Sequence, residues 1–243
     1  MRRWAGRQYL AYHRRMEKCR GLPSLLTCVL IAAPACPAAT VPDAALDLHA
    51  VEAAQRQADT RFDETLDSAV PVRRARTGHL LVQPRIDGEE AGWFILDTGA
   101  GGMVIDRAAA DRVAMPVLEA VQVLGIGSSE SARTRQGESF ALGPVTISGL
   151  RYVELDLAHL SRMMGVDIAG IVGFDLLARA VVELDAGAPA MRLHDPDHYT
   201  LPDGRWQDLR FSNKHPVVAA RFEGDRDGFF VLDTGSNDTV IFH

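Results

Sequence analysis

Short apolar segments separated by Gly, Pro, Asp and Ser recur along the chain from residue 79 onward. Apolar and β-branched residues bounded by turn residues are typical of β-strands. The pattern predicts strands at residues 79–86, 93–96, 121–126, 139–142, 145–147, 152–157, 181–184 and 190–193. One short helix is expected at residues 107–113. The pattern therefore predicts an all-β protein with little helix.

Turn residues indicate how two of these strands are paired. Asp87-Gly88 is a strong turn signal that directs the chain from 79–86 towards 93–96. The polar, glycine-containing stretch 127–131 is expected to form the end of a projecting hairpin, in which 121–126 pairs with 139–142.

Residues 40–75, which precede the strands, have a different composition, rich in Ala, Asp, Glu, Gln and Arg. Apolar residues at helical spacing in this segment are Leu48, Val51, Ala54, Ala58 and Phe62, and Pro71 would end such a helix. The segment is predicted to be a linker, or a helical spacer that resembles a propeptide.

Two apolar runs end in the same polar tripeptide, Asp97-Thr98-Gly99 in the first and Asp233-Thr234-Gly235 in the second. The two aspartates are 136 residues apart (233 − 97), and the flanking residues match at the same offset without a gap. The matching pairs are His79 and His215, Val82 and Val218, Arg85 and Arg221, Gly88 and Gly224, Gly92 and Gly228, and Phe94 and Phe230. This pattern indicates an internal duplication.

A further stretch, 168–177, has bulky aliphatic residues that end in a glycine, Ile171-Val172-Gly173, and continues as a predicted short helix. The combination of a strand that ends in Leu-Asp-Thr-Gly-Ala, a later hairpin and Ile-Val-Gly resembles the aspartic peptidases of the pepsin/retropepsin type. It is most similar to the bacterial exported retropepsin-like proteins. The resemblance implies an acid-protease β-barrel with one complete lobe at 76–196, a connector at 197–212 and the start of a second lobe at 213–243.

The resemblance also implies roles for particular residues. Asp97 and Asp233 would be the catalytic dyad, and their loops would be supported by Thr98, Gly99, Thr234 and Gly235. Ile171, Val172 and Gly173 would pack under the first catalytic loop, and Gly125, Ile126, Gly127 and Ser128 fall where the family carries its flap. The implied substrate is a peptide or protein, and neither a cofactor nor a metal ion is implied.

The chemistry of such a pair explains the choice of residues. Two carboxyl groups at close range cannot both ionise, so they share one proton and supply an acid and a base in one site. The pair of catalytic aspartates in aspartic proteases is the standard example of this effect. Glycine after Asp-Thr lets two loops approach closely, and each threonine hydroxyl can hydrogen-bond to the partner loop.

Other interpretations of these residues remain open. The two Asp-Thr-Gly segments are also compatible with plain turns at strand ends, and Ile171-Val172-Gly173 with an ordinary core segment. His194-Asp195 and Asp197-His198 have the composition of a metal cluster, although loop composition explains them better. His79 and His215 are interpreted as structural, because they recur with the strand. A catalytically silent peptide-binding module on the same fold is the alternative function.

Charge and cysteine distribution separate a leader from the body of the chain. Residues 1–39 carry a net charge of +6, and the remainder carries −12. An acidic body argues against nucleic acid as a partner. All three cysteines, Cys19, Cys28 and Cys36, lie in the leader. A basic region, a short apolar core and small residues predict a signal peptide at 1–39, with Met1 or Met16 as the start, and export to the periplasm or beyond. An uncleaved membrane anchor is the alternative.

The second repeat is expected to continue beyond the sequence. Ile171-Val172-Gly173 begins 74 residues after Asp97 (171 − 97), and the same offset from Asp233 falls past His243. The expectation is therefore a longer natural protein with a second lobe. If that lobe is truly absent, a homodimer in which each copy supplies Asp97 is expected instead.

Overall fold

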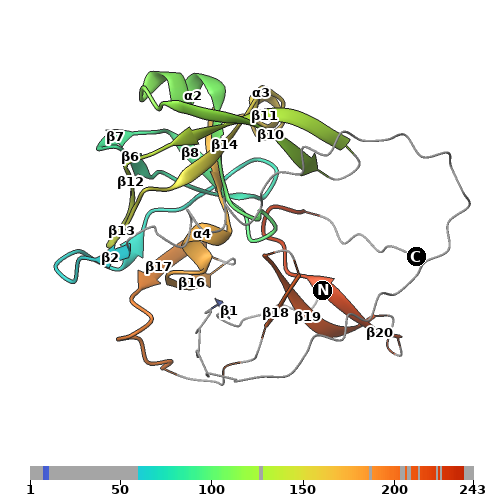
Figure 1. Ribbon diagram of the computed structural model, residues 1–243. Coiled ribbons are helices and arrows are strands. Elements are labelled where there is room, and N and C mark those ends of the chain that lie inside the picture. The colour runs from blue at the N-terminus through green and yellow to red at the C-terminus, as the bar shows by residue number, and fades with distance from the viewer. Residues whose placement is uncertain are drawn as a thin grey trace, which may run out of the picture.

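The computed structural model describes residues 8–10, 60–125, 128–185, 188–202, 206, 209–212, 214–222, 224 and 226–237 (Figure 1). Strands dominate these residues, so the prediction of an all-β chain is confirmed. The helices within the described residues are short: α2 (Arg107–Arg112), α3 (Ala158–Met164) and α4 (Phe174–Leu177). No helix among the described residues is long and apolar enough to cross a membrane.

An eight-stranded sheet forms the centre of the first repeat. Its strands are, in spatial order, β10 (Val117–Gly125), β11 (Ser128–Gln136), β14 (Arg151–Leu155), β9 (Met103–Asp106), β15 (Ile168–Val172), β8 (Trp93–Leu96), β5 (Leu80–Val82) and β4 (Arg73–Arg74). β8 lies between β15, to which it is parallel, and β5, to which it is antiparallel. The strand that leads to Asp97 is thus central in the sheet.

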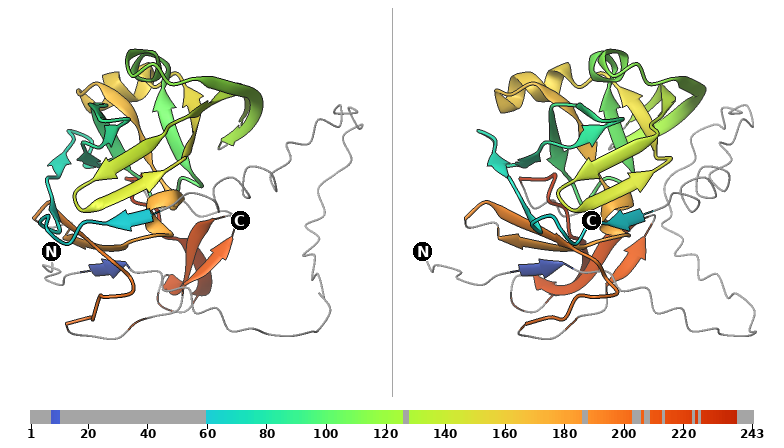
Figure 2. Two further views of the ribbon diagram at one scale, coloured as in Figure 1. Left: turned by 60° about the vertical axis from the view of Figure 1, so that its left-hand side comes forward. Right: turned by 90° about the vertical axis from the view of Figure 1, so that its left-hand side faces the viewer.

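Three smaller sheets complete the fold. The five-stranded sheet contains β2 (Thr60–Phe62), β13 (Val145–Ser148), β12 (Ser139–Leu142), β6 (Arg85–Ile86) and β7 (Glu89–Glu90). The four-stranded sheet contains β1 (Gln8–Leu10), β16 (Val181–Asp185), β17 (Ala190–His194) and β3 (Ala69–Val70). The three-stranded sheet contains β18 (Arg210–Ser212), β19 (His215–Phe222) and β20 (Arg226–Val231). This last sheet lies on the side of the molecule away from α2 and α3 (Figure 2).

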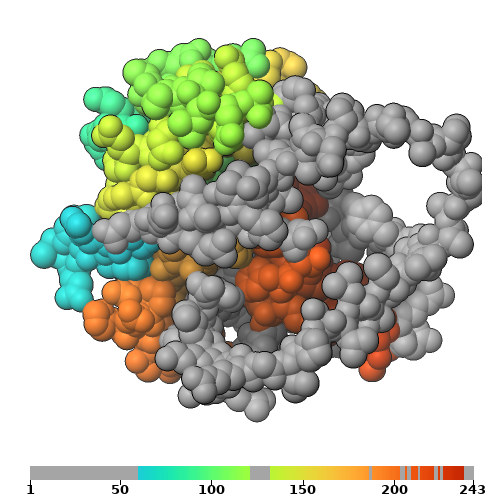
Figure 3. Space-filling model, in the orientation of Figure 1, coloured from blue at the N-terminus to red at the C-terminus, as the bar shows by residue number. Residues whose placement is uncertain are grey.

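The main hydrophobic core lies within the first repeat. Phe94, Phe140 and Tyr152 are its largest fully buried side chains. The β19–β20 hairpin is less buried than its counterpart in the first repeat. Phe229 is 67% exposed, whereas Trp93, the matching residue in the first repeat, is half-buried. Figure 3 shows the first repeat and the β18–β20 residues as two groups on one face of the molecule.

The N-terminal boundary predicted for the lobe is wrong. β2 pairs with β13, β3 with β17 and β4 with β5, so residues 60–75 belong to the sheets of the first repeat. Phe62, which was assigned to a helical spacer, lies in a strand and packs against the core. Helical spacing of apolar residues could not exclude this outcome, because short strands carry too few residues to show their own period. The predicted spacer at 40–59 lies outside the described residues.

The predicted partner of residues 121–126 is also wrong. β10 pairs with β11, so that Gly125 lies opposite Ser128, whereas β12 pairs with β13 and β6. The sequence of β11, Ser-Ser-Glu-Ser-Ala-Arg-Thr-Arg-Gln, is too polar to be recognised as a strand by apolar alternation.

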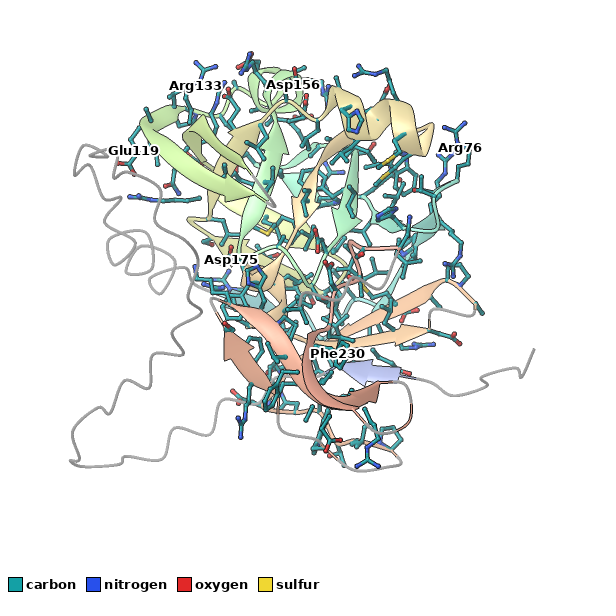
Figure 4. The ribbon with its side chains drawn as sticks, turned by 90° about the vertical axis from the view of Figure 1, so that its right-hand side faces the viewer. Arg76, Glu119, Arg133, Asp156, Asp175 and Phe230 are labelled. Carbon is teal, nitrogen blue, oxygen red and sulfur yellow. The ribbon has the colours of Figure 1, made fainter. Side chains whose placement is uncertain are left out.

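Ion pairs with one buried carboxylate explain why β11 can be so polar. The side chain of Glu154 on β14 is 1% exposed, and it accepts hydrogen bonds from Arg107, Arg133 and Arg135. Arg135 is itself buried and also contacts Asp111, at 2.6 Å. Burial alone would raise the pKa of Glu154, but the hydrogen bonds from the three arginines lower it below its usual range. Figure 4 places Arg133 on the hairpin, at the opposite end of the molecule from Phe230.

Glu154→Gln is expected to lower the free energy of unfolding by about 3 kcal/mol, because it leaves the buried Arg135 without the carboxylate that it shares with Arg107 and Arg133. Chemical denaturation at neutral pH measures this change. Glu89→Gln is the control, since Glu89 is exposed on β7. Equal unfolding free energies for the two variants would show that the cluster contributes no stability.

Candidate active site

The first Asp-Thr-Gly loop is fixed by the parallel pair of β8 and β15. Its residue Asp97 follows the last residue of β8, and its backbone N–H donates to the carbonyl of Val172 at 3.0 Å. The Ala100 carbonyl accepts from the N–H of Phe174 at 2.9 Å. A Cβ on Gly173 would lie 2.6 Å from the Ala100 carbonyl oxygen, so a larger residue there would displace the loop. Ile171-Val172-Gly173 thus lies directly beside the first loop.

The second loop follows a hairpin with the same register as the first. β5 and β8 place Val82 opposite Phe94, and β19 and β20 place Val218 opposite Phe230. Each position in the second hairpin is 136 residues after its counterpart in the first. Asp97 follows directly on β8, which ends at Leu96, whereas Leu232 lies between the end of β20 and Asp233.

The first residue of α4 contacts β18 and the residue before β19, at the edge of the three-stranded sheet. The ring of Phe174 meets that of Phe211 on β18 edge to face, with centroids 5.6 Å apart. The ammonium group of Lys214 lies 6.0 Å from the centroid of the Phe174 ring. Phe174 is the residue after Gly173. The segment that packs on the first loop therefore also contacts the three-stranded sheet of β18, β19 and β20.

The two threonines join the loops by reciprocal hydrogen bonds. The Thr98 hydroxyl donates to the Leu232 carbonyl at 2.5 Å and accepts from the N–H of Thr234 at 3.0 Å. The Thr234 hydroxyl donates to the Leu96 carbonyl at 2.8 Å and accepts from the N–H of Thr98 at 3.1 Å. Each hydroxyl therefore binds a carbonyl and an N–H of the opposite loop.

The two glycines let the aspartates approach each other. A Cβ on Gly99 would lie 2.5 Å from the carboxyl carbon of Asp233, and a Cβ on Gly235 would overlap the carboxyl group of Asp97. Each glycine N–H donates to the aspartate of its own loop, at 2.7 Å for Asp97 and 2.8 Å for Asp233. Only glycine is compatible with this geometry.

The electrostatics of the pair are those of carboxyl groups that share a proton. Burial, the charge of Asp233 and a hydrogen bond with Asp233 raise the pKa of Asp97 to about 7, against the opposing effect of the N–H groups of Gly99 and Ala100. Burial disfavours the ionised form, and a neighbouring carboxylate disfavours it further. The pair therefore retains a proton well above the pH at which an isolated aspartate loses it.

The predicted flap is only partly described. Gly125 and Ser128 lie opposite each other at the end of the β10–β11 hairpin, and Ile126 and Gly127 lie outside the described residues. A role as a substrate-covering flap stays a prediction.

Two residues near the site escaped sequence reasoning. His79, interpreted as structural, lies with its Nε2 2.8 Å from the carbonyl oxygen of Gly235. Asp175 is 1% exposed and accepts from the N–H of Met103 at 3.2 Å; burial raises its pKa. Figure 4 shows Asp175 near the end of the sheet that carries Phe230. The recurrence of histidine at 79 and 215 was the available signal for the first residue, and nothing in the sequence marks the second.

The end of β17 and the loop that follows it place two histidines beside acidic side chains. His198 Nδ1 lies 3.2 Å from Asp195 Oδ2 and 3.5 Å from Glu64 Oε1. His194 instead points its Nε2 towards Glu183, at 3.4 Å. No group of three or more His, Cys, Asp or Glu side chains in the described part of the chain could hold a metal ion.

Thr98→Val is expected to lower the free energy of unfolding by about 2 kcal/mol, because it leaves a carbonyl and an N–H at the loop junction without their partner. Denaturant-induced unfolding of this variant should be compared with that of Thr98→Ser, which retains the hydroxyl. If the valine and serine variants unfold alike, the reciprocal hydrogen bonds do not hold the loops together.

Comparisons with known proteins match the part of the chain that contains the first Asp-Thr-Gly segment. Residues 82–176 match the family model described as aspartyl protease, a segment that contains Asp97 and ends before Asp233. None of the curated proteins matches the chain. Among solved structures, the chain is similar to a retropepsin-like aspartic protease from Rickettsia conorii, with a TM-score of 0.40 and 17% identity, over 56% of this chain and 94% of that chain. The match of residues 82–176 to the family model confirms the predicted resemblance to aspartic peptidases.

Proposed function

We propose that the protein is an aspartic endopeptidase, in which Asp97 and Asp233 are the catalytic residues that hydrolyse the peptide bonds of a substrate. The observation that supports this most directly is the pair of Asp-Thr-Gly loops, which are joined by reciprocal threonine hydrogen bonds and bring the carboxyl groups of Asp97 and Asp233 within hydrogen-bonding reach. The match of residues 82–176 to an aspartyl-protease family model supports the same class of activity.

The proposed reaction uses one shared proton. Asp97, whose pKa is raised, donates its proton to the carbonyl oxygen of the peptide bond, while Asp233 takes a proton from the water that attacks the carbonyl carbon. The resulting diol then collapses: Asp233 gives its proton to the amide nitrogen, the C–N bond breaks and a hydroxyl proton returns to Asp97. The pair is again singly protonated, and neither a metal nor a covalent intermediate takes part.

The proposed site needs only one molecule. Asp97 and Asp233 belong to the same chain, so the pair does not require a homodimer. We further propose a first lobe that includes β2, β3 and β4 and a second lobe to which β18, β19 and β20 belong. The shared register of the β5–β8 and β19–β20 hairpins supports this division.

Incubation of the purified protein with an unfolded protein substrate at acid pH tests the proposal. Internal cleavage that a pepstatin-like peptide inhibitor blocks is the expected result. Peptide or inhibitor binding without cleavage would instead support a catalytically silent peptide-binding module. Absence of both would contradict any peptide-directed function of the site.

We also propose that the protein acts outside the cytoplasm. The basic leader with a short apolar core and the absence of cysteine from residues 40–243 support export. Sequencing the N-terminus of protein from its native host tests this: a mature start between residues 36 and 43 is expected, and an intact Met1 or Met16 would contradict cleavage.

A further inference from the structure

A histidine of the first repeat binds the second catalytic loop directly. His79 comes just before β5 and is 6% exposed. Its Nε2 lies 2.8 Å from the carbonyl oxygen of Gly235, a residue 156 positions later in the chain. Since a carbonyl oxygen only accepts hydrogen bonds, Nε2 must carry the hydrogen.

The other side of the imidazole ring is also occupied. His79 Nδ1 lies 2.8 Å from the hydroxyl of Thr77 and 3.4 Å from Nδ2 of Asn237. With the hydrogen on Nε2, Nδ1 of the neutral ring is an acceptor, and both neighbours can donate to it. The two sides together fix the orientation of the ring and point Nε2–H at Gly235.

The histidine at the equivalent place in the second repeat does something different. His215 Nδ1 lies 3.1 Å from the carbonyl oxygen of Ser212, within its own repeat. The matching histidines therefore do not form matching contacts: His79 hydrogen-bonds to the opposite Asp-Thr-Gly loop, whereas the hydrogen bond of His215 stays close to its own strand.

The two loops are correspondingly held in different ways. The Asp97 loop rests on β15 and the start of α4, through the carbonyl of Val172 and the N–H of Phe174. In the described residues, β20 pairs with β19 alone. On the side of its own hairpin, the N–H of Leu232, just before the Asp233 loop, donates to the carbonyl of Pro216 at 2.8 Å. From the first repeat, the Asp233 loop receives the threonine hydrogen bonds and the hydrogen bond from His79.

Gly235 is a sensitive point at which to hold this loop. Its N–H donates to the carboxylate of Asp233 at 2.8 Å, and its Cα lies so close to Asp97 that a Cβ would overlap that carboxyl group. A small displacement of Gly235 therefore changes both the orientation of Asp233 and its approach to Asp97. We propose that His79 is a positioning residue that sets the geometry of the aspartate pair by holding the Gly235 carbonyl. This inference rests on the proposed peptidase function.

Paired substitutions separate positioning from bulk and polarity. Glutamine at position 79 places an N–H donor near the place of Nε2, whereas the shorter asparagine reaches only the place of Nδ1. We expect His79→Asn to lower kcat on a peptide substrate by about 10- to 100-fold with little change in KM, because a misplaced catalytic group slows the chemical step. His79→Gln should retain activity within about threefold of the unmodified protein, by the same reasoning. His215→Asn, the matched control, should leave kcat and KM unchanged.

A second measurement does not depend on activity. The carboxyl groups of Asp97 and Asp233 can be titrated by carbon-13 NMR in each folded variant, with melting temperatures to confirm folding. His79→Asn should shift the titration of the pair, and His79→Gln and His215→Asn should not. A shifted titration in a protein that cleaves no peptide would retain the positioning role and reject the proposed function.

Several outcomes would overturn the inference. These are equal activity and titration for the asparagine and glutamine variants, an equal effect of His215→Asn, or a change in KM alone. Failure of His79→Asn to fold while His79→Gln folds would assign the bond to stability of the fold and would likewise overturn it.

Discussion

Asp97→Asn is expected to lower peptide hydrolysis by at least about 1,000-fold at the optimum pH. Asparagine has nearly the shape of aspartate, but it can neither give nor take the proton that the pair shares. Asp233→Asn should have a similar effect, because both carboxyl groups take part in each step and the loss of either one stops the cycle. Initial rates on an internally quenched peptide, measured for the two variants, give the size of the effect.

Asp156→Asn is the control for these substitutions. Asp156 is exposed, its side chain accepts a hydrogen bond from the N–H of Ala158, and asparagine can accept that bond equally well. Its activity should equal that of the unmodified protein. Substantial turnover by Asp97→Asn, with an intact fold, would remove Asp97 from the mechanism and with it the proposed function.

The rate of peptide hydrolysis should also fall as the pH rises above neutrality. Since the pKa of Asp97 is raised to about 7, the singly protonated pair persists through the mildly acid range and loses its proton as the pH rises through about 7. A rate that falls above neutrality is therefore expected, and the pH profile of kcat/KM measures it. A maximum well above neutrality would contradict a shared proton on this pair.

The elements that sequence patterns predicted best are those whose own residues decide their structure. The apolar run of β8 corresponds to the predicted strand 93–96, because a strand buried in the middle of a sheet has apolar residues on both faces. Asp87-Gly88 forms the predicted turn, and both residues have positive φ values, 52° and 81°. Asp106 caps the predicted helix, α2, by accepting from the N–H groups of Ala108 and Ala109.

The elements that were missed are those whose partners lie far away in the sequence. β11 is a strand because Glu154, on β14, neutralises its arginines, and no local pattern shows that pairing. Residues 60–75 join the first repeat because edges of three sheets were available to β2, β3 and β4. The role of His79 was missed for the same reason, since its partner Gly235 becomes a neighbour only when the two loops meet.

The duplicated sequence was informative about the site for a physical reason. Matching flanks at one offset predict that two loops follow two similar hairpins. In each loop the threonine hydrogen-bonds to the opposite loop, and the glycine leaves room for the opposite aspartate. It was less informative about symmetry. His79 and His215 match in sequence but bind different carbonyls, and Phe229 is exposed where Trp93 is half-buried. Equivalent positions in the two repeats therefore share the same strand register, but they do not all make the same contacts.

The aspartate pair should also make the protein less stable as the pH rises. The pKa of Asp97 is raised from 3.8 to about 7 in the folded protein, so the folded state binds a proton that the unfolded state has already lost over that interval. The free energy of unfolding must then decrease as the pH increases between about 4 and about 7, by at most about 4 kcal/mol. The stabilising contribution is complete below the unfolded pKa and is lost above the folded one.

Asp97→Asn removes this dependence, because asparagine carries no charge that burial or Asp233 can oppose. The variant is therefore expected to be more stable than the unmodified protein at pH 8, by up to about 4 kcal/mol, and close to it at pH 4. Urea denaturation of both proteins at a series of pH values measures the difference, in which the titration of other carboxyl groups, such as Glu154, cancels. Asp156→Asn should show no such divergence, since that side chain is exposed. A constant difference between Asp97→Asn and the unmodified protein across the series would mean that Asp97 titrates alike in the folded and unfolded chains, and the carboxyl groups would then not share a proton.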